Sequence, residues 1–201
     1  MIRLLLADDQ AMVRGALAAL LGLEADLEVV AEVARGDEVV AAAEQHHPDV
    51  ALLDVEMPGL DGIAAAAALK AASPHIRVLI VTTFGRPGFV RRALESGADG
   101  FVVKDTPARA LAEAVRRVHH GLRVVDPELV ADSLLAGQSP LTGRETDVLR
   151  AARDGAPVAV IARRVFLSPG TVRNHLSAAI GKTGAANRAE AVRVAEESGW
   201  L

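Results

Sequence analysis

The chain has no cysteine and no tyrosine, and its aromatic residues are four phenylalanines and one tryptophan in 201 positions. The missing cysteine excludes disulfide bonds, thiolate nucleophiles and cysteine-based zinc sites. No apolar run approaches the roughly 20 residues of a membrane-spanning helix. The run Met1–Ala7 also meets Asp8 and Asp9 too soon for a signal peptide. A globular protein of the reducing cytoplasm is therefore expected.

Neither sign of charge dominates the chain, but the charges are unevenly distributed. Residues 1–120 hold 12 Lys/Arg against 17 Asp/Glu, whereas residues 140–201 hold nine against six. An acidic front part and a basic back part indicate different partners for two domains. The basic excess is a modest indication of nucleic-acid binding, because many neutral domains reach it by chance.

Residues 1–120 alternate short apolar runs with longer alanine-rich stretches of helical period. The predicted strands are Ile2–Ala7, Glu28–Val33, Val50–Asp54, Arg77–Thr82 and Gly100–Val103. The predicted helices are Ala11–Leu21, Asp37–His46, Gly62–Ala71, Pro87–Ser96 and Pro107–His120. Five such βα units imply an α/β fold with a parallel sheet covered on both faces. The commonest order for five strands is the flavodoxin-like 2-1-3-4-5.

Three carboxylates follow two strands that this order makes neighbours. Asp8 and Asp9 end the first strand, and Asp54 ends the buried run Val50–Leu53 just before a Met-Pro-Gly turn. The carboxyl ends of parallel strands line one rim of the sheet, so these acids are expected to converge there. Converging carboxylates favour a hard cation, and Mg²⁺ suits oxygen ligands beside a phosphate. Taken alone, Asp54 is equally well explained as a strand-end acid that caps the next helix.

Thr82 ends the fourth predicted strand and Lys104 ends the fifth, which places a hydroxyl and an ammonium on the same rim. Such a set can carry a phosphoryl group, with Asp54 as the nucleophile, Thr82 donating a hydrogen bond and Lys104 pairing with the new charge. Each member alone has a plainer explanation. Lys104 can simply neutralise carboxylates, and Thr82 can be an ordinary β-branched strand residue.

These residues resemble the receiver domain of two-component response regulators. The resemblance rests on the acid pair Asp8-Asp9, on Asp54 with Met57-Pro58-Gly59, on Thr82, and on Lys104 in the run 100–105. It implies that Asp54 is the phosphoacceptor, and that Asp9, Asp54 and the backbone carbonyl of Glu56 bind Mg²⁺ with help from Asp8. It also implies that Phe101 is a switch aromatic, which turns inward when Thr82 moves toward the phosphoryl group. Without the resemblance, Phe101 would be an ordinary hydrophobic residue of a sheet-edge strand.

The sequence after this receiver, predicted over residues 1–120, divides into a linker and a helical domain. Residues 121–139 are expected to form the linker, with a turn at Asp126-Pro127 and a short helix over Leu129–Leu135. Residues 140–201 are expected to form an all-α domain. Its first three helices begin at a capping box over residues 142–145, at Val158 and at Ser168-Pro169.

The third of these helices has two distinct faces. Val172, Leu176 and Ile180 form an apolar stripe, and the opposite face is polar with Thr171, Arg173, Asn174 and Ser177. A tight turn followed by a helix that exposes Arg and Asn near its start is typical of a helix-turn-helix DNA reader. Arg suits guanine and Asn suits adenine, although either can contact phosphate instead. Phosphate contacts are expected from Arg163, Arg164, His175 and Lys182, and the alternative is an ordinary solvated face.

The second half resembles the LuxR-type, four-helix DNA-binding domain of the NarL/FixJ response regulators. The matching motifs are Leu141-Thr142-Gly143-Arg144-Glu145, Ile161-Ala162, the run 167–175 and Asn187-Arg188-Ala189-Glu190-Ala191. The resemblance implies a fourth helix over Arg188–Ser198 that supplies a dimer contact, to which Val192 and Ala195 would contribute. Ser177 stands where many relatives have a basic residue, so the promoter sequence cannot be carried over. Finer motifs, including Asp9-Gln10 and Gly199-Trp200, resemble the regulators of membrane-lipid desaturase systems, whose partner is a membrane-bound histidine kinase.

The expected function is that of a response-regulator transcription factor. A sensor histidine kinase would phosphorylate Asp54, and the phosphorylated chain would form a homodimer that binds promoter DNA. The resemblance implies no enzymatic activity beyond Mg²⁺-dependent phosphorylation and dephosphorylation of the chain's own Asp54. One alternative is a small acid-cluster phosphatase, for which the helical back half leaves little material to build a substrate pocket. The other is a constitutive DNA-binding dimer whose receiver is silent.

Overall fold

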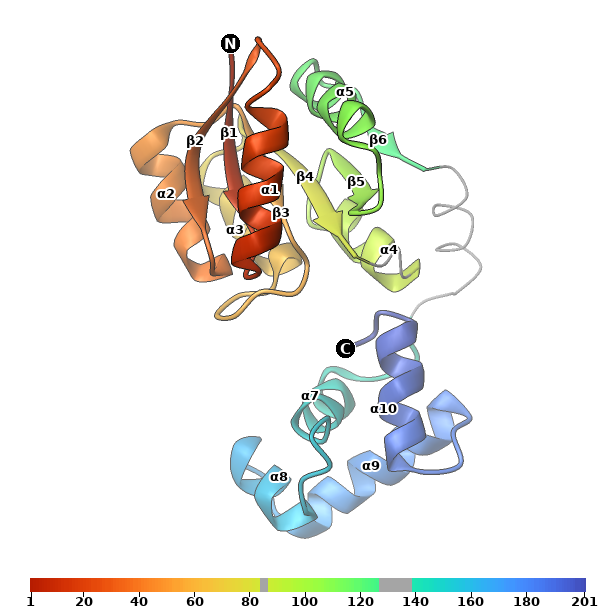
Figure 1. Cartoon of the computed structure of the whole chain (residues 1–201). Helices are drawn as coiled ribbons and strands as arrows, with labels where there is room; N and C mark the ends of the chain where they lie inside the picture. Colours follow the sequence, from red (N-terminus) through yellow and green to blue (C-terminus); the bar gives the residue numbers. More distant parts are fainter. Residues whose placement is uncertain (84–86, 127–138) are drawn as a thin grey trace. The chain divides into compact units, whose positions relative to one another are not determined.

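The computed structural model describes residues 1–83, 87–126 and 139–201. These residues form two compact units, one of residues 1–83 and 89–126 and the other built on residues 139–201 (Figure 1). Along the first unit the elements are β1 (Ile2–Ala7), α1 (Ala11–Leu21), β2 (Leu27–Val33), the 3-10 turn η1 (Gly36–Glu38), α2 (Val39–His46), β3 (Val50–Leu53), α3 (Gly62–Ala72), β4 (Arg77–Thr82), α4 (Pro87–Glu95), β5 (Gly100–Val103), α5 (Ala108–His119) and β6 (Val124–Val125).

The strands of the first unit form one parallel sheet in the order β2-β1-β3-β4-β5-β6. Strand β1 lies between β2 and β3, so the winding reverses there, and Ala7 at the end of β1 pairs with Leu53 at the end of β3. At the other side of β3, Thr82 at the end of β4 pairs with Val103 at the end of β5. The predicted order 2-1-3-4-5 is confirmed, and all four strand ends lie along one rim.

The prediction of five strands is wrong by one, because β6 adds a short sixth strand beside β5. Val124 and Val125 pair with Gly100 and Phe101. The open edge of β5 needs hydrogen-bond partners, and the chain returning from α5 supplies them. A side chain at Gly100 would leave no room for this pairing, since a Cβ there would lie 2.9 Å from the Val124 carbonyl oxygen. The helix expected over Leu129–Leu135 lies outside the described residues.

The side chains of each strand alternate between two hydrophobic clusters, one on each face of the sheet. Leu5 of β1, Leu53 of β3 and Ile80 of β4 pack with α2, α3 and α4 on one face. Leu4, Leu52 and Leu79 pack with α1 and α5 on the other face (Figure 1). This double coverage explains why the strands read as continuous apolar runs.

Residues 139–201 of the second unit form four helices around their own core, namely α7 (Gly143–Ala151), α8 (Val158–Arg164), α9 (Pro169–Thr183) and α10 (Arg188–Glu197). Thr142 and Glu145 close the predicted capping box at the start of α7. Ser168 caps α9, where its Oγ accepts a hydrogen bond from the Thr171 N–H at 3.1 Å. Helix α9 contacts α7, α8 and α10 and is the centre of the unit. No helix among the described residues is both long enough and apolar enough to cross a bilayer.

Candidate functional site

Three carboxylates meet at the carboxyl rim of the sheet, where β1 and β3 end. One carboxylate oxygen from each of Asp8, Asp9 and Asp54 can be chosen so that the three lie within 4.8 Å of one another. Asp8 and Asp54 are buried, whereas Asp9 is exposed. The Asp54 N–H donates to the Ala7 carbonyl at 2.8 Å, which fixes the end of β3 against the end of β1. The cluster therefore follows directly from the strand pairing.

Lys104 supplies the positive charge of this cluster. Its Nζ lies 2.7 Å from Asp8 Oδ2 and 3.0 Å from Asp54 Oδ2. The Lys104 N–H donates to the Thr82 carbonyl at 2.7 Å, so β4 and β5 hold Lys104 and Thr82 side by side. One ammonium cannot neutralise three carboxylates, and the remaining negative charge on oxygen ligands fits a hard divalent cation.

Burial and the contacts between Asp8, Asp54 and Lys104 shift the pKa values of Asp54 and Lys104. Burial raises the pKa of Asp54 above its usual range, although the hydrogen bond and charge of Lys104 act in the opposite direction. For Lys104, burial alone would lower the pKa, but the hydrogen bonds and charges of Asp8 and Asp54 outweigh it and raise the pKa. Lys104 is therefore charged at neutral pH and remains an electrostatic partner for the rim.

Sequence reasoning missed the residues that hold the acids in place. Arg14 on α1 donates from Nη1 to the Asp8 carbonyl at 2.6 Å and lies 3.5 Å from Glu32 on β2. The Gln10 N–H donates to Asp8 Oδ1 at 2.9 Å. The signal for Arg14 was its place in the first turn of the helix that follows the acid pair, because side chains of a helix point back toward its N-terminus.

The other predicted receiver residues take these positions. Thr82 is buried at the end of β4. Phe101 is only 1% exposed, and it packs in the cluster that contains Phe89 and Val90 of α4. Glu56 lies in the turn two residues after Asp54, with its side chain exposed. Phe101 is thus an interior residue in this conformation, and β6 covers the edge of the strand that carries it.

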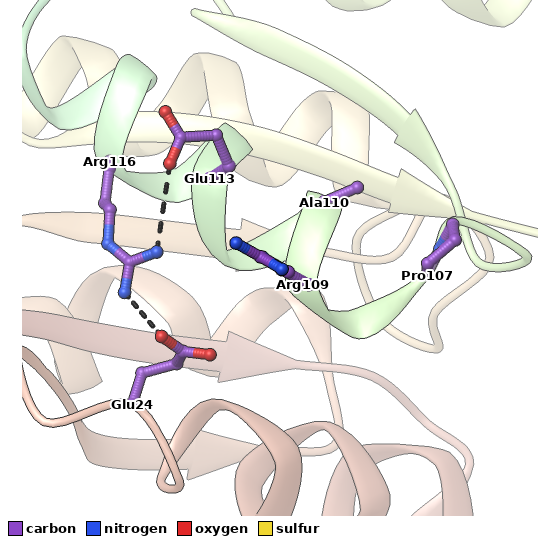
Figure 2. A pocket seen from close by; sticks show the side chains of 6 residues that line it. All are labelled: Glu24, Pro107, Arg109, Ala110, Glu113 and Arg116. Carbon is purple, nitrogen blue, oxygen red and sulfur yellow. Dashed lines mark hydrogen bonds and ion pairs between the residues drawn. The ribbon is translucent and has the colours of Figure 1, made fainter.

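A separate hollow of about 750 Å³ lies between α5 and the segment that follows α1 (Figure 2). Its main interaction is an ion-pair group around Arg116. The guanidinium contacts Glu24 at 2.6 Å and Asp26 at 2.7 Å, and it lies 3.8 Å from Glu113 on its own helix. These pairs link α5 to the connection between α1 and β2, on the face of the sheet that α1 and α5 cover.

The second unit presents the polar face of α9 to solvent. Val172 and Leu176 are buried and Ile180 is half-buried, as expected for the apolar stripe. Arg173, Asn174 and Ser177 are exposed, whereas Thr171 and His175 are half-buried. Thr171 Oγ1 also lies 2.8 Å from Ser168 Oγ, so this hydroxyl is shared with the cap of the helix.

Two of the cations expected to contact phosphate have partners inside the unit. Lys182 Nζ lies 2.8 Å from Glu145 Oε2, which ties the last turn of α9 to the start of α7. Arg164 lies 2.7 Å from Asp154 Oδ2 and donates to the Ala151 carbonyl at 2.9 Å. Arg163 and Arg173 are exposed and make no ion pair with any residue in the described ranges. The exposed positive charge therefore gathers around the turn between α8 and α9.

A cluster of carboxylates with a lysine at the carboxyl rim of a parallel sheet, joined in one chain to a helix-turn-helix unit, is the arrangement of a receiver domain with a DNA-binding domain. Residues 4–116 match the response regulator receiver domain, and residues 139–195 match the bacterial regulatory proteins of the luxR family. The chain therefore belongs to the two-component response regulators of the NarL/FixJ family, and its function is that of a DNA-binding transcription factor.

Relatives of similar length support this assignment over the whole chain. The transcriptional regulatory protein DesR of Bacillus subtilis (strain 168) is 42% identical over 201 residues, with 100% of both chains covered. The response regulator RamR of Streptomyces coelicolor is 39% identical over 202 residues, with 100% of this chain and 98% of the relative covered. The crystal structure of ChrA, a response regulator of a heme-sensing two-component system, is 33% identical and superposes with a TM-score of 0.58 over 100% of this chain and 98% of that chain.

Proposed function

We propose that Asp54 accepts a phosphoryl group from the phosphohistidine of a sensor histidine kinase. A carboxylate oxygen of Asp54 attacks phosphorus, the P–N bond breaks, and the histidine leaves with the electron pair of that bond. The observation that carries this proposal is the ammonium of Lys104, which contacts both Asp8 and Asp54 at the rim. After transfer, Lys104 is placed to pair with the added charge of roughly one half to one unit, since a phosphorylated side chain carries about −1.5 to −2 at pH 7.

The acid cluster fits a resident Mg²⁺, which the chemistry of its donors supports. Asp8, Asp9, Asp54 and the backbone carbonyl of Glu56 would hold the ion. When bound, Mg²⁺ supplies positive charge to the phosphoryl oxygens. Arg14 and the Gln10 N–H keep Asp8 in position within the cluster. The same cluster supports the Mg²⁺-dependent self-phosphorylation by small phosphoryl donors, and the dephosphorylation, that we propose for Asp54.

Thr82 and Phe101 are proposed as the first residues to respond. Thr82 would donate its hydroxyl proton in a hydrogen bond to the phosphoryl group, and Phe101 on the neighbouring strand would stay packed inward as Thr82 moves. Phe101 of β5 pairs with Ile80 of β4 on one side and with Val125 of β6 on the other. Strand β5 therefore connects the rim that carries Thr82 to the segment that follows α5.

We further propose that phosphorylation promotes a homodimer that binds promoter DNA. The proposed bounds are residues 1–120 for the receiver, 121–139 for the linker and 140–201 for the DNA-binding domain, and β6 at the start of this linker pairs with the receiver's sheet. The predicted DNA contacts are Thr171, Arg173, Asn174, His175, Ser177 and Lys182. Joining two weak DNA readers raises the effective concentration of the second. The phosphoryl donor would be a membrane-bound kinase, and the chain itself would act in the cytoplasm, where the DNA is.

Phosphoryl transfer is tested with the full chain, Mg²⁺ and acetyl phosphate. The wild type is expected to take up one phosphoryl group per chain and to shift toward a dimer in light scattering. Asp54→Asn should abolish both effects. Asp105→Asn removes an exposed carboxylate near the same rim and should leave both unchanged. Uptake by Asp54→Asn at the wild-type level would refute the acceptor assignment.

DNA binding is tested on duplexes that the wild-type chain selects from a random-sequence library. Beryllofluoride, a mimic of the phosphoryl group, should increase affinity for the selected duplexes. Arg173→Ala should lower this affinity by about tenfold or more, because a bidentate base contact contributes about 1–3 kcal/mol. Equal affinity with and without beryllofluoride would instead support the constitutive dimer with a silent receiver.

A further inference from the structure

Phe166 occupies an unusual position between α8 and α9. Its backbone has φ = +55°, and it is one of two residues other than glycine with a positive φ among the described residues. Its side chain is 93% exposed, which makes it the most exposed of the large hydrophobic residues in the described chain. A left-handed conformation costs an L-residue about 1–2 kcal/mol. A phenylalanine here is therefore strained and also buries almost none of its apolar surface.

The ends of two neighbouring helices show what this position normally requires. At the end of α8, the Leu167 N–H donates to the Ala162 carbonyl at 2.9 Å, across the left-handed Phe166. Helices α9 and α10 close in the same way, with Ala185 donating to Ile180 across Gly184 and Trp200 donating to Ala195 across Gly199. Glycine is the usual residue at this point of the motif because it has no Cβ to clash. Helix α8 alone of the three carries a phenylalanine there.

The surroundings of Phe166 point to DNA as its partner. Phe166 belongs to the turn between α8 and α9, just before the N-cap residue Ser168 of α9. When a helix-turn-helix binds DNA, the start of the second helix enters the major groove and the first helix crosses the sugar–phosphate backbone, so the turn lies beside one strand. Arg163 and Arg173, which are exposed and form no ion pair within the described ranges, lie on either side of Phe166 in the sequence. Positive charge at both sides fits a polyanion and disfavours a second cationic copy of the same surface.

We propose that Phe166 is a DNA-contacting residue, which packs its ring against apolar surface of the promoter beside the groove that α9 enters. The inference rests on the DNA-binding function and adds an apolar contact to it. Two parts of DNA offer such surface, namely the deoxyribose of the flanking strand and the C5-methyl of thymine. The conformational strain at Phe166 is retained because glycine would supply the turn but not the ring.

The test compares Phe166→Gly and Phe166→Tyr with the wild type, as full chains loaded with beryllofluoride and measured on the selected duplexes. Phe166→Gly is expected to lose about tenfold in affinity, as burial of part of an aromatic ring implies. The same variant should raise the melting midpoint of the second unit by about 4 °C, because the strain is removed. Phe166→Tyr keeps the ring and should keep the affinity. Opposite signs for stability and affinity are the signature of a contact residue.

Two further measurements define the contact. Phe166→Gly should leave the slope of log affinity against log salt concentration unchanged, whereas Arg163→Ala should reduce it by about 0.9, the effect of one phosphate contact. Replacing thymine by uracil in the duplex removes the methyl group. If the ring contacts thymine, the replacement weakens binding by the wild type but not by Phe166→Gly. If the ring contacts deoxyribose, the replacement leaves the affinity of each protein unchanged.

Several results would overturn the inference. Unchanged affinity of Phe166→Gly would do so, as would a fall in both its melting midpoint and its affinity, which would make Phe166 a structural residue. Loss of dimerisation by Phe166→Gly in the absence of DNA would assign the ring to a second copy of the chain. A wild-type chain that selects no duplex would instead refute the DNA-binding function itself, so the two failures can be told apart.

Discussion

Gly62 lies where the first turn of α3 packs closely against the backbone of Asp54 and Val55. It is the first residue of α3, its N–H donates to the Val55 carbonyl at 2.9 Å, and a Cβ at this position would overlap the carbonyl oxygen of Asp54. The glycine therefore allows α3 to pack directly against the backbone of Asp54, the proposed phosphoacceptor. Arg14 and Gln10 hold Asp8 in place on the neighbouring strand.

Gly62→Ala should disturb both stability and phosphorylation. The backbone must shift to relieve the overlap, which displaces Asp54 from Lys104. The free energy of unfolding measured by chemical denaturation should fall by about 1–3 kcal/mol. Uptake from acetyl phosphate should fall several-fold. Gly15→Ala is the matched control, since a Cβ at that exposed site in α1 meets nothing within 4 Å. The free energy of unfolding of the control should rise by about 0.5–1 kcal/mol, because alanine has a higher helix propensity than glycine. Equal stability and equal phosphoryl uptake in Gly62→Ala and Gly15→Ala would contradict this account.

The Arg116 group in Figure 2 gives a prediction for a single carboxyl. Two hydrogen bonds from Arg116 lower the pKa of Asp26 from 3.8 to about 2. Because the folded-state pKa lies below the unfolded one, the pair adds stability above about pH 4, which is lost as the pH falls through about 2. Carbon-13 NMR titration of Asp26 should show this low midpoint, and Arg116→Gln should return it toward 3.8. An unchanged midpoint in Arg116→Gln would assign the shift to another cause.

At the scale of elements, Asp99 joins three segments of the first unit. Its carboxylate accepts from Lys70 of α3 at 2.6 Å, from Arg77 at 2.9 Å and from the Val78 N–H of β4 at 2.9 Å, just before β5 begins. Burial would raise the pKa of Asp99, but these hydrogen bonds and the charge of Lys70 outweigh it and lower the pKa. The Asp99 carboxylate therefore holds α3, β4 and the start of β5 together, and we call this group of contacts the Asp99 clamp.

Asp99→Asn should lower the free energy of unfolding at neutral pH by about 2 kcal/mol, the range for hydrogen bonds to charged groups. In the wild type the contribution is present above the unfolded pKa of an aspartate and is lost as the pH falls through the lowered pKa of Asp99. The variant should lose this part of the acid dependence. Denaturant titrations at several pH values check it, with Asp105→Asn as the control. Parallel pH curves for wild type and Asp99→Asn would contradict the clamp.

The regular elements were predictable because each has a complete local signal. β1, β4 and β5 have the predicted bounds, since a run of buried apolar residues bounded by charge or glycine defines a strand without reference to the rest of the chain. The capping box and Ser168-Pro169 defined two helix starts in the same way. β6 was missed because two valines are too short for any period, and only the open edge of β5 makes them a strand.

The side-chain pairings were less predictable than the elements. The convergence of Asp8, Asp9 and Asp54 followed from strand order alone. The ion pair between Lys182 and Glu145 depends on how α9 crosses α7, which no local pattern encodes. The left-handed Phe166 was also hidden, because the sequence signal for such a helix end is glycine or asparagine. These misses arise where tertiary contacts or function override local preference.

At the scale of the whole molecule, the single tryptophan provides a probe for one unit. Trp200 packs against the core of the second unit, and the chain has no other tryptophan and no tyrosine. Saturating Mg²⁺ should therefore raise the unfolding temperature seen by circular dichroism for the first unit without moving the tryptophan emission transition, because a ligand stabilises the unit that binds it. Asp9→Asn should abolish the shift. Equal shifts of both signals would contradict a magnesium site confined to the acid cluster.

The sixth strand has a practical consequence for anyone recombining such proteins. Val124 and Val125 form the edge strand of the sheet. A fusion protein in which another output domain begins at position 121 would leave Gly100 and Phe101 without their pairing partners. A junction after Asp126 keeps β6 paired with β5, and it is the position we would choose for fusing this receiver domain to another output domain.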